Sequence, residues 1–451
     1  MTTPELQKRL DEVEQALLNR WPETRIAPTL ERIAMLSDLL GSPQLSYPTI
    51  HIAGTNGKTT TTRLIDSLCH ELGLRTGRFT SPHLESFLER ICINEESISP
   101  EGMIATYEDI ALYLDLVDSR MPNRLSFFEA MTALSFVAFA EFPVDVGIFE
   151  CGMGGEWDST NVINAAVSVM TPIGFDHMQY LGDTLTKIAG TKSGIFKEGC
   201  FAVMARQEQE AATVLLKKAA EMSAIPIREG IEYSVTKRSL AVGGQEMSIQ
   251  GVYGEYREFF LPLHGEHQSS NAATALAAVE VFSGEKQLDE EIVRQAFARA
   301  TSPGRCEVVL RQPTVIIDAA HNPHGAVSLK RTLSEEFNFD AIVGVVAPMG
   351  DKDIDGILQE FEPIMNRLII TRNSSHRAAP LDQLRSDAEE IFGRDRVEQE
   401  SSLESAITRA IRLATEINAL GEGHCGVVIT GSVVSAGEAR AIIRKLKGGS
   451  L

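Results

Sequence analysis

The stretch HIAGTNGKTTTTR at residues 51–63 decides how the rest of the chain is interpreted. The usual phosphate-loop pattern GxxxxGK[ST] places a glycine five positions before the second glycine, and here that position holds Ile52. Gly54 and Gly57 still let backbone N–H groups approach an anion, and Lys58 adds a positive charge. The stretch therefore predicts a phosphate-binding loop that differs from the kinase and GTPase pattern.

The sequence on both sides of this loop has the strand-loop-helix setting that a phosphate loop requires. YPTIHIA at residues 47–53 is a short apolar strand, and TTTTRLIDSLCHELG at residues 59–73 is a helix closed by Gly73. A surface turn before an ordinary helix is the alternative interpretation. The context favours nucleotide binding and leaves open whether Thr59 or Thr60 reaches a magnesium ion.

Length and composition indicate an ordinary globular protein with more than one domain. A chain of 451 residues exceeds the usual limit of one hydrophobic core. Its 62 acidic and 42 basic residues give a formal charge of −20, which disfavours nucleic acid or an anionic membrane as main partner. We find no secretory signal, no apolar run near the roughly 18 residues of a membrane span and no CxxC motif. We therefore expect a cytoplasmic protein with reduced cysteines, and a monomer.

The order of apolar segments predicts an α/β fold with two domains. Residues 1–300 alternate strand-like and helix-like segments, which indicates a mostly parallel sheet covered by helices, with a small antiparallel patch near residues 231–262. TSPGR at residues 301–305 is typical of a linker. Residues 301–451 then contain four apolar strands, within TVIIDAAHNPHG, DAIVGVVAPMG, NRLIITR and CGVVITGS. They predict a second, smaller domain with ligand residues at the carboxyl ends of its strands.

Several polar residues follow predicted strands. Glu150 ends the buried strand VDVGIFE and precedes a glycine-rich turn, so its carboxylate can hold magnesium. His177 alone is a poor magnesium ligand and is interpreted as a core or loop residue. Lys192 is either a surface lysine or, if buried near metals, an amine that loses its proton. Ser81 beside Pro82 is weak evidence for any role.

Two further groups lie later in the chain. HGEHQSSN at residues 264–271 has HxxH spacing but no third ligand cluster, so we interpret it as a polar loop that caps a helix through Ser270 or Asn271. Arg305, Asp318 and His321 occupy the linker and a strand end. We expect these three to face the cleft between the domains.

Taken in order, these motifs resemble a known enzyme family. YPTIHIAGTNGKT, RTGRFTSPHL, FECGMGGEWDSTN, TPIGFDHMQYLGDTLTKIAG, LHGEHQSSNAATAL and DAAHNPHGA are similar to folylpolyglutamate synthases, including the bifunctional form that is also a dihydrofolate synthase. These enzymes belong to the Mur ligase superfamily, and SPHL after RTGR is characteristic of its folate branch. The resemblance implies a phosphate-loop ATPase domain over residues 1–300 and a Rossmann-like glutamate-ligase domain over residues 301–451.

The resemblance also implies a reaction. A carboxylate of dihydropteroate, or of the glutamate tail of a reduced folate, attacks the γ-phosphate of ATP to give an acyl phosphate. The amine of L-glutamate then displaces phosphate. ATP and two magnesium ions are the implied cofactors, and the ions and a positioned lysine would stabilise the transferring phosphoryl group.

Site residues are carried over from the resemblance position by position. The ATP contacts are Gly54, Thr55, Asn56, Gly57, Lys58, Thr59, Thr60, Asn271, Arg305 and Asp318. The implied magnesium ligands are Thr60, Ser81, Glu150 and His177, which reverses the interpretation of His177 given above. Lys192 matches a lysine that is carbamylated in this family, and His321 lies where glutamate is positioned. The pterin pocket would contain Ile26, Ala27, Pro28, Ser126, Phe127, Phe128, Glu129, Trp157, Asp158 and Ser159.

Two positions depart from the family pattern. Glu156 stands where an arginine is common, and Thr191 replaces the glutamate that usually precedes the lysine. Three alternatives follow: polyglutamylation alone, a Mur-type ligase that adds an amino acid to a cell-wall precursor, and a nucleotide-binding protein without catalysis. The last is motivated by the two departures.

Overall fold

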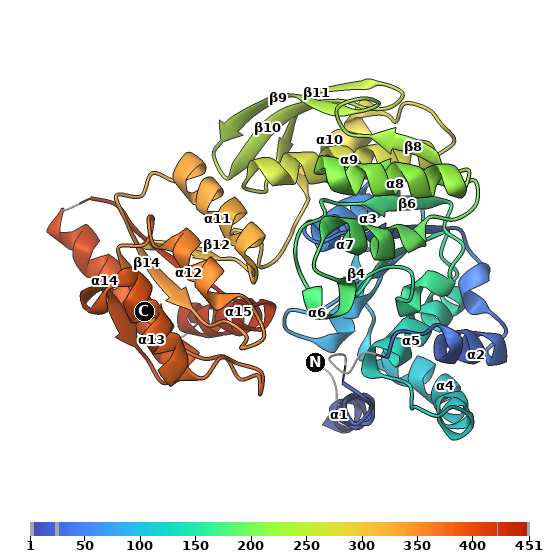
Figure 1. Ribbon diagram of the computed structural model, residues 1–451, viewed down its shortest axis with the longest axis horizontal. Helices are drawn as coiled ribbons and strands as arrows, with labels where there is room; N and C mark the ends of the chain where they lie inside the picture. Colours follow the sequence, from blue (N-terminus) through green and yellow to red (C-terminus); the bar gives the residue numbers. More distant parts are fainter. Residues whose placement is uncertain (1–3, 23–26, 422, 449–451) are drawn as a thin grey trace. The chain divides into compact units, whose positions relative to one another are not determined.

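The computed structural model describes residues 4–22, 27–421 and 423–448, which form two compact units. Unit 1 contains Met1–Ser239, Glu246–Pro262 and Ser269–Ala300. Unit 2 contains Leu240–Gln245, Leu263–Gln268 and Thr301–Leu451. The chain is coloured along its sequence in Figure 1. No helix within the described ranges is long and apolar enough to cross a membrane.

Unit 1 is built on an eight-stranded sheet of order β4-β3-β2-β5-β1-β6-β7-β8. Its strands are β1 (Thr49–Ala53), β2 (Thr76–Phe79), β3 (Ile91–Ile93), β4 (Glu96–Ser97), β5 (Val146–Glu150), β6 (Val167–Met170), β7 (Phe201–Met204) and β8 (Ile225–Arg228). The six neighbouring strands β2, β5, β1, β6, β7 and β8 run parallel to one another. Strands β3 and β4 add antiparallel pairs at the β2 edge of the sheet. The carboxyl ends of β2, β5, β1 and β6 therefore meet side by side at one edge of the sheet.

The helices of unit 1 follow the predicted alternation. They are α1 (Pro4–Leu18), α2 (Glu31–Leu39), α3 (Lys58–Glu71), α4 (Pro100–Arg120), α5 (Phe127–Glu141), α6 (Met178–Leu181), α7 (Leu185–Lys192), α8 (Gln209–Glu221), α9 (Glu266–Phe282) and α10 (Glu290–Ala298). Short 3-10 turns are η1 (Pro43–Leu45), η2 (Phe87–Arg90), η3 (Ser159–Val162) and η4 (Ser193–Ile195). The helix after the phosphate loop ends as expected, with Gly73 in the left-handed region directly after its cap.

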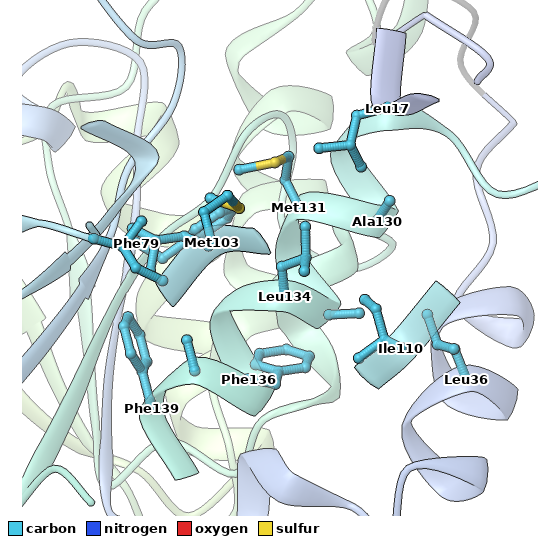
Figure 2. Close-up of a cluster of buried hydrophobic side chains, with 14 of the residues drawn as sticks. Leu17, Leu36, Phe79, Met103, Ile110, Ala130, Met131, Leu134, Phe136 and Phe139 are labelled. Carbon is cyan, nitrogen blue, oxygen red and sulfur yellow. The ribbon is translucent and has the colours of Figure 1, made fainter. Parts of the chain in front are cut away.

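A large hydrophobic core lies around α5. The sequence FFEAMTALSFVAFAE is apolar on all sides, which is typical of a helix that is buried all round. Figure 2 shows Leu134 and Phe136 of α5 among side chains from α1, α2 and α4. Phe139, one turn further on, packs near Phe149 of β5, with ring centroids 5.6 Å apart. This packing fixes β5, and with it the position of Glu150, against the helical layer.

A three-stranded sheet and one helix follow. The sheet has the order β11-β10-β9 and contains β9 (Ser234–Ala241), β10 (Gly244–Gln250) and β11 (Glu255–Leu261), where turn-rich sequence predicts a small patch. Helix α9 begins at Glu266, so Ser270 and Asn271 lie inside it and do not cap it. The expected polar loop at residues 264–271 is therefore wrong. The polar residues of this segment are compatible with both a loop and the first turn of a helix, so the sequence alone does not show where α9 begins.

Unit 2 contains a six-stranded sheet of order β12-β13-β17-β14-β15-β16. The strands are β12 (Glu307–Arg311), β13 (Thr314–Ile317), β14 (Ala341–Val346), β15 (Arg367–Ile370), β16 (Val397–Gln399) and β17 (Cys425–Thr430). All neighbours are parallel except β12 and β13. The helices are α11 (Pro323–Glu336), α12 (Ile354–Phe361), α13 (Leu381–Phe392), α14 (Leu403–Leu420) and α15 (Val433–Gly448), with the 3-10 turn η5 (Arg394–Arg396). The four predicted strands are β13, β14, β15 and β17.

Candidate functional site

The phosphate loop joins the buried strand β1 to the first turn of α3. Gly54 and Gly57 both have positive φ, at 145° and 88°. A Cβ on Gly54 would lie 1.9 Å from the Thr171 hydroxyl oxygen and 2.8 Å from the Thr171 carbonyl oxygen. A Cβ on Gly57 would lie 2.5 Å from Oδ1 of Asn271, so Asn271 packs against the loop. Both glycines are required by close approach as well as by backbone conformation.

Gly54→Ala is expected to weaken nucleotide binding at least about tenfold, because the added methyl group displaces the loop from backbone atoms that cannot move aside. Titration of an ATP analogue by calorimetry measures the effect. Gly190→Ala is the matched control, since a Cβ there meets nothing within 4 Å and α7 tolerates alanine. Equal affinity of Gly54→Ala and wild type would contradict the close packing of the loop.

Two lysine amines converge on the carbonyl oxygen of Gly54. Lys58 Nζ donates to this oxygen at 3.2 Å and to Thr55 O at 3.1 Å, and Lys192 Nζ donates to it at 2.7 Å. Lys192 is buried, and burial together with the charge of Lys58 lowers the pKa of Lys192 to about 7. The sequence left a surface position open for Lys192, and the structure places its amine in the phosphate loop. Two amines on one carbonyl make the loop a strong anion site.

The other loop residues hold the loop against the strand end of β6. Thr55 N–H donates to Pro172 O at 2.9 Å, and Asn56 N–H donates to the same oxygen at 3.4 Å. The Thr55 hydroxyl donates to Gly174 O and accepts from Gly174 N–H, both at 3.0 Å. Residues that sequence reasoning assigned to nucleotide binding thus also fix the segment that leads to His177.

Oxygen atoms suited to a hard cation gather at the ends of β5 and β2. The buried carboxylate of Glu150 accepts from the Thr59 hydroxyl at 2.8 Å and from Ser81 N–H at 3.4 Å. Magnesium prefers carboxylate and hydroxyl oxygens together with waters and phosphates. Among the described residues, no three His, Cys, Asp or Glu side chains group as metal ligands by themselves. The donor set fits magnesium bound jointly with a phosphate. Thr59 contacts Glu150, and the neighbouring Thr60 is buried.

His177 follows β6 in a left-handed conformation, with φ at 50°, directly before α6. Its N–H donates to Asp176 Oδ1 at 2.9 Å, and its Nε2 lies 3.7 Å from Asp176 Oδ2. The negative charge of Asp176 also acts on Lys192, where it favours the charged amine. Asp176 belongs to this group of residues although sequence reasoning gave it no role.

The glycine-rich turn after β5 packs directly on the end of α7. A Cβ on Gly155 would lie 2.5 Å from the carbonyl oxygen of Lys192. Glu156 N–H donates to Thr191 O at 2.8 Å. The two departures from the family pattern therefore touch through their main chains, while the Glu156 side chain is exposed.

The expected pterin-pocket residues on α5 have structural contacts. Ser126 caps α5, and Glu129 completes the capping box by accepting from Ser126 N–H at 2.8 Å. The Glu129 carboxylate also pairs with Arg32, whose Nε lies 2.9 Å away, and Arg32 donates in turn to Ala27 O at 3.2 Å. Of the N-terminal pocket residues, Ala27 is half-buried, Pro28 is exposed and Ile26 lies outside the described residues.

Two of the expected pterin-pocket residues are aromatic side chains at the start of α5. The Phe128 ring centroid lies 5.7 Å from that of Phe79, and a Cβ on Gly152 would lie 2.6 Å from Phe128. The guanidinium of Arg90 lies over the Phe127 ring, 4.9 Å from its centroid. Sequence reasoning did not find Arg32 or Arg90, because their partners come from distant parts of the chain.

Asp158 holds the glycine-rich turn in place. It is buried, and it accepts from Met153 N–H at 2.8 Å and from the Thr160 hydroxyl at 2.6 Å. Burial raises the pKa of Asp158, and these hydrogen bonds oppose that rise. Ser159 beside it is buried at the start of η3, whereas Trp157 is half-buried and lies against Gly154. Trp157 is the side chain of these three with most surface left for a ligand.

In unit 2, Asp318 and His321 follow β13. Asp318 is half-buried and accepts from Cys306 N–H at 2.8 Å and from Ala320 N–H at 2.7 Å. Burial raises the pKa of Asp318, and the charge of Arg305 counteracts the rise. His321 Nδ1 lies 2.9 Å from Ala319 O. Since a carbonyl oxygen only accepts, Nδ1 carries the proton, and in the neutral ring Nε2 is an acceptor.

Comparison with known proteins identifies the family. The chain is 48% identical to the dihydrofolate synthase/folylpolyglutamate synthase of Mycobacterium tuberculosis, over 98% of this chain and 95% of that protein. The chain belongs to this family. Residues 52–279 match the Mur ligase middle domain, and residues 304–432 match the Mur ligase glutamate ligase domain.

Other members of the dihydrofolate synthase/folylpolyglutamate synthase family support the fold. A solved structure of the M. tuberculosis folylpolyglutamate synthase complexed with ADP has a TM-score of 0.94 and covers 97% of this chain and 99% of that one, at 48% identity. The folylpolyglutamate synthase of Lacticaseibacillus casei is 33% identical, over 75% of this chain and 79% of that protein. The α/β Mur-ligase fold expected from the resemblance is thus confirmed.

Proposed function

We propose that the chain is an ATP-dependent ligase that adds L-glutamate to dihydropteroate and to the glutamate tail of reduced folates, giving ADP and phosphate. The convergence of Lys58 and Lys192 on Gly54 O, beside the contact between Glu150 and Thr59, carries the proposal. It combines an anion site with oxygen ligands for a cation, which phosphoryl transfer from ATP requires. Family membership and the ADP complex of the M. tuberculosis relative support it.

The phosphates of ATP would lie over the loop from Gly54 to Thr60, where N–H groups of the first turn of α3 would donate to them and Lys58 would supply charge. Ser81, Glu150 and a hydroxyl of Thr59 or Thr60 would hold the first magnesium ion. When bound, that ion neutralises the charge that develops on the transferring phosphoryl group. Asn271 would contact the nucleotide from α9, beside Gly57.

The second metal site would draw on His177 and Lys192. A protonated lysine amine is no metal ligand, so Lys192 can take part only after carbamylation. Carbon dioxide adds to the neutral amine, and the new carbamate carries the negative oxygens while one proton is released. A buried amine with its pKa near 7 supplies the neutral form at physiological pH. The adjoining residue Asp176 would orient the His177 ring.

We assign residues 1–300 to ATP binding and residues 301–451 to glutamate ligation. Arg305 and Asp318 would contact ATP, and the Nε2 acceptor of His321 suits the ammonium group of an incoming L-glutamate. The acceptor pocket would use Ala27, Pro28, Ser126, Phe127, Phe128, Trp157 and Ser159, with Glu129 and Asp158 as residues that fix its walls. The net charge of −20 supports small-molecule partners over polyanions. We also propose that the protein is a cytoplasmic monomer.

A paired substrate assay tests the function. ADP release is measured with L-glutamate plus either dihydropteroate or tetrahydrofolate, and activity with both is expected. Activity with tetrahydrofolate alone would reduce the function to polyglutamylation. Stimulation by UDP-linked muropeptides would indicate a cell-wall ligase, and ATP binding without any product would indicate a non-catalytic protein. Lys58→Ala, which removes the amine that lies in the phosphate loop, is the control expected to be inactive.

A further inference from the structure

Three large apolar side chains are exposed within six residues beside the candidate metal ligand His177. Phe175 and Met178 are 51% exposed, and Tyr180 is 41% exposed. We call Phe175, Met178 and Tyr180 the 175–180 platform. Single exposed apolar residues are common on protein surfaces, but a cluster of three beside polar groups of a site is typical of a ligand-binding surface.

The platform is attached rigidly to the phosphate loop. At one end, both main-chain groups of Gly174 hydrogen-bond to the Thr55 hydroxyl, at 3.0 Å each. At the other end, Leu181 of α6 is buried in a core cluster that also contains Ile188 of α7. The short helix α6 is seen directly beside α7 in Figure 1. The platform therefore holds a fixed position relative to the phosphate loop, although its side chains face solvent.

The platform is also continuous with the acceptor pocket. A Cβ on Gly154 would lie 3.1 Å from Trp157 and 3.3 Å from Leu181, so both side chains pack on the same glycine. Trp157 is a proposed pocket residue, and Leu181 is the residue of α6 next to Tyr180. An aromatic ligand lying on Trp157 would thus be separated from α6 only by the contacts around Gly154, to which the methyl group of Thr191 also contributes.

We propose that the 175–180 platform binds the aromatic body of an acceptor whose reacting carboxylate is attached directly to its ring, and so selects dihydropteroate over a polyglutamylated folate. The inference rests on the proposed function. In dihydropteroate the carboxylate is a benzoate group, so the ring lies beside the phosphoryl group. In a folate tail, at least one glutamate separates the reacting carboxylate from the ring. The ring of a tail substrate is then held away from the platform.

The inference is tested by comparing the two acceptors in one variant. Phe175→Ala combined with Met178→Ala is expected to raise the KM for dihydropteroate roughly tenfold, because two apolar contacts to the ring are lost. The KM for tetrahydrofolate and the affinity for ATP should stay within about twofold. Phe175→Leu with Met178 intact should restore most of the affinity for dihydropteroate. Phe142→Ala, which alters an exposed phenylalanine at the end of α5, is the control expected to change neither acceptor.

A binding measurement keeps the inference independent of turnover. Trp157 fluorescence in a Trp21→Phe background reports equilibrium binding of dihydropteroate, since these are the two tryptophans of the chain. A matching loss of affinity in the platform variant supports the inference even if the wild type forms no product. Equal KM changes for both acceptors would overturn the inference, because the platform would then not distinguish dihydropteroate from tetrahydrofolate. Unchanged dihydropteroate binding in the platform variant would overturn it as well.

Discussion

Lys192→Ala is expected to lower turnover about a hundred- to thousandfold while it leaves the affinity for ATP within about threefold. The Lys192 amine contacts the Gly54 carbonyl from the side of α7, whereas the N–H groups of the loop and Lys58 remain to bind phosphate. Loss of Lys192 removes the buried amine of α7 that we propose is carbamylated. The steady-state rate of ADP release measures turnover, and calorimetry with an ATP analogue measures the affinity for nucleotide.

The pH dependence of the same residue has a defined sign. Because the pKa of Lys192 is lowered to about 7, the protonated amine dominates below that pH and cannot add carbon dioxide. Turnover should therefore fall as pH decreases through 7, and added bicarbonate should counteract the fall in the wild type. Lys192→Met keeps the length of the side chain without the amine and should resemble Lys192→Ala. Unchanged turnover in either variant would remove the lysine from the mechanism.

Asp66→Ala is expected to lower the free energy of unfolding of unit 1 by about 3–5 kcal/mol. Asp66 of α3 is 0% exposed and Arg78 of β2 is 3% exposed, and Oδ2 of Asp66 lies 2.6 Å from Nη1 of Arg78. Burial and the charge of Arg78 also lower the pKa of Arg63, another guanidinium in this cluster. Removal of Asp66 leaves the buried guanidinium groups without their carboxylate partner. Because these groups are buried, water cannot solvate their charge in its place.

Urea denaturation followed by tryptophan fluorescence measures this loss, because Trp21 and Trp157 both belong to unit 1. The double variant Asp66→Ala with Arg78→Met should recover part of the stability, since an apolar pair avoids the cost of an unpaired buried charge. Asp183→Ala, which breaks the exposed pair with Lys187, should have no measurable effect. Equal stability of Asp66→Ala and wild type would show that the cluster is hydrated.

The sequence predicted those parts of the fold that carry a strong local signal. The strands β1, β5, β14 and β17 are runs of mostly apolar residues that are buried along almost their whole length, as expected in a parallel sheet covered on both faces. The sheet-edge strand β12 was missed because its sequence EVVLR is half-buried along its length, so its pattern is ambiguous. Strand β16, at the other edge, has only three residues.

The sequence indicated which types of residue form the candidate site. It was less informative about the contacts that each of these residues makes. Lys192 and Gly54 are 138 positions apart, and only the fold brings the amine to the carbonyl. The same holds for Glu129 and Arg32, which are 97 positions apart. The sequence does not show whether a given carboxylate will accept hydrogen bonds from a ligand or from other groups of the protein. Its partners are chosen by tertiary packing, which periodicity and motif spacing do not encode.

The hydrogen bond from Glu156 N–H to Thr191 O joins the two positions at which the sequence departs from the pattern that the resemblance implies. The two positions adjoin in space. Relative to that pattern, Glu156 places a negative charge where a positive one is expected, and Thr191 lacks an expected negative charge on the neighbouring turn. Contacting positions are energetically coupled, and their substitutions do not add. The two positions therefore form one coupled unit, in which Thr191→Glu alone would add a second carboxylate next to Glu156.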